Sequence, residues 1–399
     1  EWNSAEVLAF DAIYDSTALT TLSTEKGYDV RAHIRDNLFF NIGDYFKNRV
    51  PISLAINTNL SGPFSNFALV ARAFNRPDYI TWMGDYLDNT INKKLTRDGV
   101  LVEGISYSDG YLNENLEGAE NTRDYFLTRP ADTPELTAIQ TATTGYASII
   151  QAGLDRWHAV RLPNGQFPPF GDTNFNTSTA RNAGNSAILA AYGHAAIGAG
   201  SGAQAVQLNT NLSTESNHMR ADVGAFTLWA LGTELLGNVR YFNGTPGRQF
   251  GEQILSHNAV TIDRSNMSRG TGWNVGGRDH VFTPGHLMLY EPGNNGLAVI
   301  EIDAQRPYAN KASRYQRILI LNTADLARPY LIDVFRVAGG TTHDYTLHGS
   351  IRYDQVGESS FTLTPNPATY PLLEGSETWS EPTSSGSSFP YYGFFRNVS

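Results

Sequence analysis

The spacing of apolar residues divides the chain into a helical part and a sheet part. Up to about residue 205, apolar side chains recur at i, i+3, i+4 and i+7, which is the period of one helix face. Loops marked by Pro, Gly and Asn separate these segments. The predicted helices are 5–14, 30–46, 65–74, 79–95, 135–152 and 183–196.

Past a run of small residues at 198–205, the pattern changes to alternation with period two. The small residues predict an interdomain linker, and the alternation predicts an antiparallel sheet. The predicted strands are 223–231, 258–263, 297–303, 315–322, 329–337 and 343–349, and the final segment 389–399 also has a strand pattern. Two domains are therefore predicted, helical over 1–205 and β-sheet over 206–399, as the length of 399 residues also favours.

The amino-acid composition argues against several classes of binding partner and site. The chain has no run of about 18 apolar residues, so no membrane partner is expected. It has no cysteine, which excludes disulfides and thiolate metal sites. A net charge of −10 argues against non-specific binding of nucleic acid. The chain begins at Glu1 without a signal peptide, and we expect a processed protein that is secreted or periplasmic. Nothing in the sequence fixes an oligomeric state.

Two features of the composition suit an acidic polysaccharide. Arginines are concentrated between Arg240 and Arg336, where a local cluster could bind a polyanion despite the acidic total. Scattered surface arginines are the alternative interpretation. Aromatic residues make up 12% of the chain, and their rings can stack on sugar faces, although most such rings belong to protein cores.

One segment of the sheet part combines histidine, arginine and aspartate. The run from His218 to Gly224 reads His-x-Arg-x-Asp-x-Gly and leads into an alternating apolar strand, and His257 opens a later strand. This run resembles the His-x-His-x-Asp-x-Gly pattern of the heparinase II/III-like polysaccharide lyases. The resemblance implies a multidomain α and β fold, with an α/α toroid followed by an antiparallel β-sheet domain and a cleft between them. The six predicted helices are about half the number in a closed toroid, so the resemblance implies a partial toroid. It gives His218 the place of the catalytic histidine.

The resemblance also bears on metal binding. Arg220 and Asn238 stand where the family has zinc ligands, and only His257 of that set remains. A guanidinium group only donates hydrogen bonds and cannot ligate Zn²⁺. We therefore expect no metal and no cofactor, and we expect Arg220 to pair with an internal carboxylate instead.

A lyase of this family removes the C5 proton of a uronate and expels the O4 oxygen. It needs a group that holds the carboxylate, a base and an acid. Asn59, with Asn57 as its rival, resembles the family's carboxylate-binding asparagine, although the usual following histidine is missing and a helix-capping role fits equally well. Tyr111, four residues before Asn115, resembles the catalytic tyrosine. Packing within a helix hairpin is the alternative for Tyr111.

The sequence offers further candidates for catalytic and substrate-binding residues. Tyr107 and Tyr146 are alternatives for the catalytic tyrosine, and Asp172, in the loop 162–173, is either a partner that orients a histidine or arginine or a turn-capping residue. The expected substrate-binding residues are Glu103, Tyr107, Arg220, Arg240 and Tyr241.

The resulting hypothesis is a polysaccharide lyase that cleaves an anionic, uronate-containing polymer by β-elimination. Asn59, Tyr111 and His218 are its predicted catalytic residues. An alginate-type polymer is favoured, because heavy sulfation usually requires denser basic patches than a pI of 5.4 indicates. The alternatives are a glycosaminoglycan lyase, a non-catalytic uronate-binding protein, and a glycoside hydrolase that uses Glu103 and Asp172.

Overall fold

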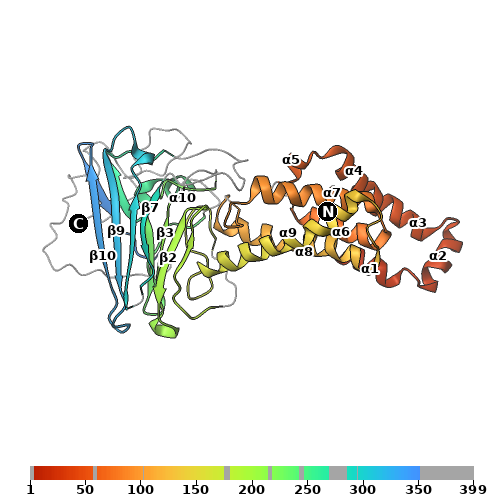
Figure 1. Cartoon of the computed structure of the whole chain (residues 1–399), viewed down its shortest axis with the longest axis horizontal. Helices are drawn as coiled ribbons and strands as arrows, with labels where there is room; N and C mark the ends of the chain where they lie inside the picture. Colours follow the sequence, from red (N-terminus) through yellow and green to blue (C-terminus); the bar gives the residue numbers. More distant parts are fainter. Residues whose placement is uncertain are drawn as a thin grey trace. The chain divides into compact units, whose positions relative to one another are not determined.

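The computed structural model describes residues 4–56, 61–101, 103–174, 180–213, 218–241, 247–268, 285–293 and 295–350 (Figure 1). They form two compact units. One is helical and contains most of the chain up to Asp155, and the other contains the sheets and begins its main part at Arg156. A short stretch, Val102–Ser106, also belongs to the sheet unit.

The helical unit is a series of α-helices with two π-helical segments. The helices are α1 Ser4–Ile13, α2 Thr17–Lys26, α3 Val30–Ile34, α4 Asn41–Arg49, α5 Ile52–Ala55, α6 Ser61–Phe74, α7 Pro77–Asn89, α8 Ile105–Thr128 and α9 Pro134–Ala159, and the π-helical segments are η1 Arg35–Phe40 and η3 Thr90–Lys94. Local capping explains several starts. Ser16 and Asp29 accept hydrogen bonds from the first turns of α2 and α3, and proline occupies the first position of α7.

Aromatic rings fill the core of the helical unit. Phe67 stacks on Tyr79 with 4.4 Å between ring centroids, and Trp82 lies parallel to Tyr86 at 5.6 Å. Such pairs add about 0.5–1.5 kcal/mol beyond the burial of their surface. Arg76 covers the Tyr79 ring at 3.9 Å and binds Asp78, so the charged groups at this helix start are also anchored to the aromatic core.

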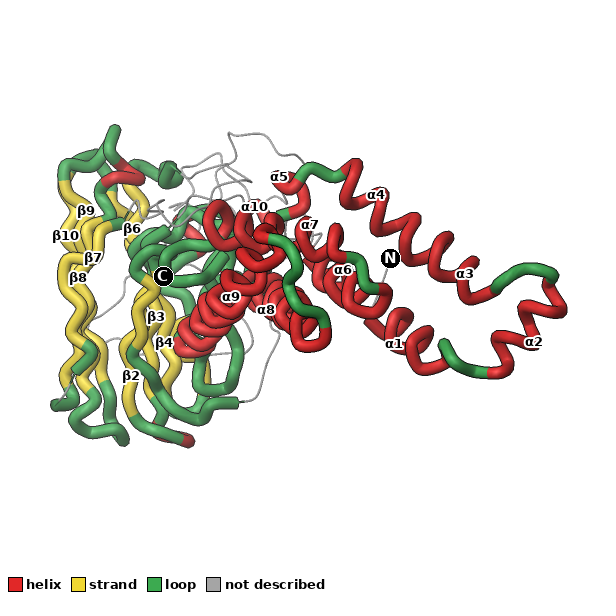
Figure 2. Tube along the Cα trace, turned by 45° about the vertical axis from the view of Figure 1, so that its right-hand side comes forward, coloured by secondary structure: helices red, strands yellow, loops and turns green. Residues whose placement is uncertain are grey.

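The sheet unit contains antiparallel strands in three sheets. A five-stranded sheet has the order β1-β2-β3-β4-β5, a four-stranded sheet has the order β10-β9-β8-β7, and β11 pairs with β6. The strands are β1 Ala187–Leu189, β2 His194–Ala199, β3 Val206–Asn211, β4 Phe226–Ala230, β5 Thr233–Leu236, β6 Ala259–Ile262, β7 His286–Glu291, β8 Leu297–Asp303, β9 Arg314–Asn322, β10 Tyr330–Ala338 and β11 His343–Thr346. The two larger sheets lie as adjacent layers (Figure 2), linked by the bond from the Tyr290 hydroxyl to the Ala196 carbonyl, 2.9 Å.

The fold class predicted from the sequence is confirmed, since helices come first and antiparallel sheets follow. Buried and exposed positions alternate along β8 and β9, which is the period-two pattern that predicted these strands. Four of the described α-helices were not predicted: α2, α5, α8 and the short α10 (Gly247–Gly251) of the sheet unit. The predicted strand at 389–399 lies outside the described residues.

Two predictions around residue 200 are wrong. The predicted helix 183–196 contains β1 and the start of β2, and the predicted linker 198–205 contains the end of β2 and a short 3₁₀ turn before β3. Small residues in both stretches allow neighbouring backbone segments to pack closely. A Cβ atom at Gly184 would lie 2.1 Å from the Val206 carbonyl oxygen, and one at Gly198 would lie 2.7 Å from the same atom. The sheets therefore begin before the predicted boundary at 205.

The buried side chain of Arg317 connects the four-stranded sheet with segments elsewhere in the sheet unit. Arg317 of β9 binds Asp333 of β10 through two bonds, Nε to Oδ1 at 2.8 Å and Nη2 to Oδ2 at 2.6 Å. Its Nη1 donates to the carbonyl oxygens of Gly224 and Asn258, at 2.8 and 2.6 Å. One side chain thereby ties together segments that are far apart in the sequence.

Replacing Arg317 by alanine is expected to lower the free energy of unfolding of the sheet unit by about 3–5 kcal/mol, because Asp333 would keep a partly buried, uncompensated charge. Denaturant titration followed by tryptophan fluorescence measures the change. The matched control is Arg328→Ala, since the Arg328 side chain is 89% exposed and should shift stability by less than about 0.5 kcal/mol. Equal effects of the two substitutions would contradict this role.

Candidate active site

A histidine–aspartate pair forms the centre of the candidate site. His218 Nδ1 lies 3.1 Å from Asp172 Oδ2. The Asp172 side chain is 3% exposed and that of His218 is 15% exposed, so the imidazole reaches the surface while its partner does not. A carboxylate bonded at Nδ1 fixes the orientation of the ring and leaves proton exchange with a substrate to Nε2.

The backbone brings these two residues together. The Asp172 amide donates to the His218 carbonyl oxygen at 2.8 Å. Gly171 has a φ of +60°, and a Cβ atom there would lie 2.7 Å from the same oxygen, so glycine is needed at this position. Ser106 donates from its hydroxyl to the Asp172 carbonyl at 2.9 Å. The loop that carries Asp172 is therefore fixed from both sides.

Arg220 supplies a buried positive charge to this arrangement. Its guanidinium donates to the carbonyl oxygens of Val239 and Arg240, and its Nη2 lies 3.4 Å from Asp172 Oδ1. The expectation that Arg220 pairs with an internal carboxylate is confirmed. Burial opposes ionisation of Asp172, but the hydrogen bond from His218 and the charge of Arg220 prevail and lower its pKa.

The residues around Arg220 do not suit a zinc ion. The fully buried His257 has its Nδ1 in hydrogen-bond contact with Asn238 Oδ1. Burial, assisted by the charge of Arg220, lowers the pKa of His257. Arg220 itself only donates. No group of three His, Cys, Asp or Glu side chains that could hold a metal occurs in the part of the chain that the structure describes. The absence of a metal cofactor stays a prediction.

Arg248 and Glu252 join the site without having been predicted there. Arg248 Nη2 lies 3.7 Å from Asp172 Oδ2, and its Nε donates to Glu252 Oε1 at 3.2 Å. Its guanidinium lies 5.8 Å from the centre of the Tyr241 ring. One signal in the sequence could have indicated the pair, namely the i, i+4 spacing of an arginine and a glutamate. Nothing in the sequence connects this pair to Asp172.

Asp222 is a second buried carboxyl group next to the site. Its Oδ1 accepts a bond from Asn211 Nδ2 at 2.6 Å. Burial raises the pKa of Asp222 to about 7, although the bond from Asn211 and the charge of Arg220 favour the ionised form. Asp222 is therefore protonated in the native protein over a pH range in which an unfolded aspartate is charged.

Two predicted site residues lie in the interior. Tyr111 is 2% exposed, and its hydroxyl donates to the Ile56 carbonyl at 3.2 Å. Arg240 is fully buried; it binds Glu234 at 2.9 Å and the Phe167 carbonyl at 3.0 Å. The predicted direct contacts of both residues with a polymer are not supported by these positions, because neither side chain reaches solvent. Arg240 instead supports the loop that leads to Asp172.

The other predicted residues have different surroundings. Glu103 is 3% exposed, and Arg220 is fully buried, so both also lack a surface for substrate. Tyr107 and Tyr241 are half-buried. Tyr146 donates from its hydroxyl to Asp88 at 3.0 Å. Asn59 and its rival Asn57 lie outside the described residues.

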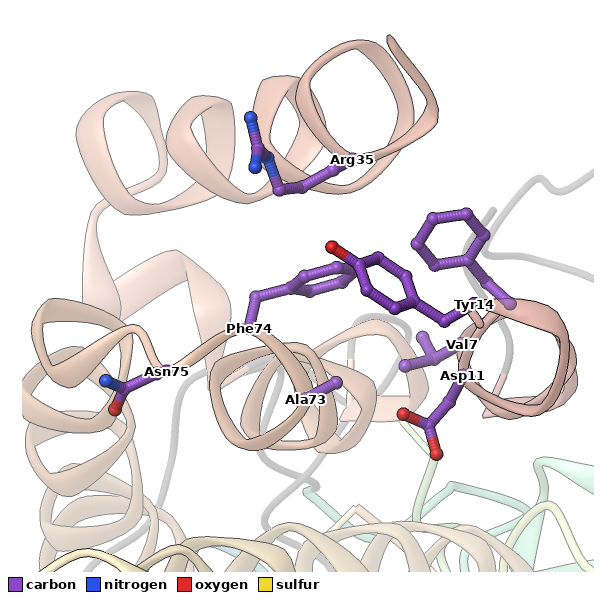
Figure 3. A pocket seen from close by; sticks show the side chains of 8 residues that line it. Val7, Asp11, Tyr14, Arg35, Ala73, Phe74 and Asn75 are labelled. Atoms are coloured by element: carbon purple, nitrogen blue, oxygen red, sulfur yellow. The ribbon is translucent and has the colours of Figure 1, made fainter. Parts of the chain in front are cut away.

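The helical unit has a pocket of its own, of about 300 Å³ (Figure 3). The rings of Tyr14 and Phe74 lie between the helices that carry Arg35 and Ala73. Arg35 is bonded to Asp36 through Nε at 2.6 Å, and Asp11 adds another acidic group to the lining. This combination offers little net positive charge to an acidic polymer, so the site at His218 is the stronger candidate.

Comparison with known proteins identifies the fold. No family model matches the chain, and no curated protein matches it. Among solved structures, heparan sulfate lyase HepC from Pedobacter heparinus is similar with a TM-score of 0.57 and 15% identity, over 78% of this chain and 50% of that one. A heparinase III gene product with methylated lysines gives a TM-score of 0.53 and 14% identity, over 70% of this chain and 45% of that one. The fold is heparinase III-like.

The chain spans about half the length of these solved structures. At such low identities the similarity concerns the arrangement of helices followed by a β domain. None of the described helices is long and apolar enough to cross a bilayer.

The raised pKa of Asp222 predicts a specific effect of pH on stability. Its contribution is complete below the unfolded pKa near 3.8 and is lost as pH rises through about 7. As pH rises across this range, the free energy of unfolding of the wild type should therefore fall relative to that of Asp222→Asn, by up to roughly 1.4 kcal/mol per pH unit. Denaturant titrations at several pH values measure the difference.

The matched control is Asp325→Asn, because the Asp325 side chain is 62% exposed. It provides the reference for replacing an exposed carboxyl group by an amide. A difference between wild type and Asp222→Asn that does not change with pH would show that Asp222 is ionised in the folded protein throughout the range.

Proposed function

We propose that this protein is a polysaccharide lyase that cleaves a uronate-containing glycosaminoglycan by β-elimination. The His218–Asp172 pair carries the proposal, since it presents an oriented imidazole at the surface of a sheet unit with a heparinase III-like fold. The similar structures include a heparan sulfate lyase. This favours the glycosaminoglycan alternative over the alginate-type polymer preferred from the sequence.

The proposed chemistry uses His218 as a proton-transfer group. A base takes the C5 proton, the C5–H electron pair forms the C4=C5 double bond, and the C4–O4 bond breaks with O4 receiving a proton from an acid. Asp172 holds the imidazole through Nδ1 and stabilises the imidazolium that forms when Nε2 accepts a proton. The positive charge of Arg220 stabilises the ionised form of Asp172, so the carboxylate stays available to hold the imidazole.

The second proton-transfer role is assigned to a tyrosine by the family resemblance. The burial of Tyr111 moves this proposal to Tyr107, which was its alternative and is half-buried near the start of α8. The carboxylate-holding role of Asn59 stays a prediction, as does the contact of Tyr241 with substrate.

A glycoside hydrolase receives less support from the same geometry. It would need two carboxyl groups, one of them protonated to act as the acid. Asp172 is held in its ionised form by His218 and Arg220, and Glu103 is 3% exposed. A non-catalytic polysaccharide-binding protein is the remaining alternative, because Tyr111 is engaged inside the helical unit.

The lyase proposal is tested by the ultraviolet absorbance of unsaturated products on heparan sulfate, chondroitin, hyaluronan and alginate, with and without EDTA. We expect product from a glycosaminoglycan, unaffected by EDTA. His218→Ala should lower kcat by at least about 100-fold, because proton transfer by a positioned side chain contributes about 10²–10⁴-fold.

His286→Ala is the control, since His286 is exposed on β7, outside the site. Binding of a polymer without product from the wild type would identify a binding protein instead. Equal activity of the two histidine variants would remove His218 from the mechanism.

The tyrosine assignment is tested by comparing Tyr107→Phe with Tyr111→Phe. Tyr107→Phe is expected to lower kcat by about 100-fold or more through loss of a proton donor. Tyr111→Phe should retain most of kcat and lose about 1 kcal/mol of stability, because the buried hydroxyl bonds the Ile56 carbonyl. The opposite result, measured by steady-state kinetics and denaturant titration, would restore Tyr111 as the catalytic residue.

A further inference from the structure

Arg248 differs from the other arginines around Asp172 in its exposure. Arg220 and Arg240 are fully buried, and their guanidinium groups bind backbone carbonyls and carboxylates. The Arg248 side chain is 38% exposed. It therefore keeps part of its positive charge accessible to a ligand from solvent.

Arg248 is also a direct neighbour of His218. Both side chains approach the same oxygen, Asp172 Oδ2, the imidazole Nδ1 at 3.1 Å and the guanidinium Nη2 at 3.7 Å. The second distance is longer than a hydrogen bond, so Asp172 attracts Arg248 without fixing its geometry. Glu252 contacts the Nε edge at 3.2 Å. Among the described residues, none forms a hydrogen bond or ion pair with Nη1 of Arg248.

The charge balance favours an acidic ligand at this place. Asp172 already has His218 and Arg220 within bonding distance, so it does not need Arg248 for its neutralisation. The guanidinium fork can bind the two oxygens of a carboxylate or sulfate in parallel, which is geometrically selective. The neighbouring Tyr241 ring offers an apolar surface beside that fork.

We propose that Arg248 is a specificity-determining residue that binds an oxyanion, carboxylate or sulfate, of the polymer unit placed at His218. Glu252 keeps the guanidinium extended until the substrate anion competes for it. The inference rests on the proposed function, since it deepens the substrate recognition of the same site. Arg248 takes no part in bond making or breaking.

The first experiment compares KM and kcat for wild type, Arg248→Ala and Arg248→Lys on heparan sulfate. Loss of a charge-assisted contact should raise KM by about 10- to 100-fold in Arg248→Ala, with kcat changed by less than about 3-fold. Arg248→Lys keeps the charge but loses the fork, and should restore part of the affinity. Arg328→Ala, an exposed arginine paired only loosely with Asp325 at 3.9 Å, should match the wild type.

The same variants on chemically desulfated heparan sulfate and on hyaluronan distinguish the two sources of the anion. An effect of Arg248→Ala that disappears without sulfate identifies a sulfate, and an effect that persists identifies the uronate carboxylate. A fall in kcat with unchanged KM would overturn the proposal, because it would mean that Arg248 only supports Asp172. An effect of the same size for Arg328→Ala would also overturn it.

Binding measurements separate this inference from the proposed reaction. Titration calorimetry with heparan sulfate oligosaccharides reports affinity whether or not elimination occurs. If the wild type binds but forms no unsaturated product, and Arg248→Ala binds about 10-fold or more weakly, the lyase proposal fails and the role of Arg248 stands. If the wild type binds none of the acidic polymers, both fail.

Discussion

Buried guanidinium groups impose the strongest constraint on the sheet unit. Arg220, Arg240 and Arg317 are essentially inaccessible to water. Arginine is not deprotonated in proteins, so each group must be surrounded by acceptors or the fold loses several kcal/mol. The acceptors are carboxylates on neighbouring segments and backbone carbonyls from loops far away in the sequence. The need to supply acceptors for these guanidinium groups therefore determines the loop conformations of this unit as much as apolar packing does.

The geometry of the candidate site follows from this constraint. Asp172 is placed where Arg220 requires an anion, and the same carboxylate then orients His218 through its other oxygen. Arg240 holds the preceding loop by binding the Phe167 carbonyl. The imidazole is therefore positioned by side chains that would be needed for stability even without a reaction. An oriented imidazole next to a half-exposed arginine results from the way the interior charges are neutralised.

The sequence predicted those features that are encoded by local periodicity. Buried and exposed positions alternate along β8 and β9, and the observed bounds of β8, β9 and β10 lie within about one residue of the predicted ones. The pairing of Arg220 with a carboxylate was predicted from the family resemblance, which puts Arg220 at the position of a metal ligand, combined with the charge of the guanidinium. The helix predicted at 183–196 failed because short strands rich in alanine and glycine can imitate helical spacing, and what fixes them is the close approach of Val206. The burial of Tyr111 depends on contacts with residues far away in the sequence, which spacing cannot reveal.

The buried guanidinium of Arg220 makes this site respond to its surroundings differently from a metal-centred site. Zinc binding requires deprotonated ligands and is reversed by chelators, so a metal-centred loop arrangement depends on metal supply and pH. The positive charge of Arg220 depends neither on metal supply nor on pH in the ordinary range. What limits the arrangement is the ionisation of Asp172, whose pKa is lowered from the ordinary value of 3.8. Its contribution is present above that value and is lost only as pH falls through the lowered pKa, so this support for His218 stays intact into moderately acidic solution.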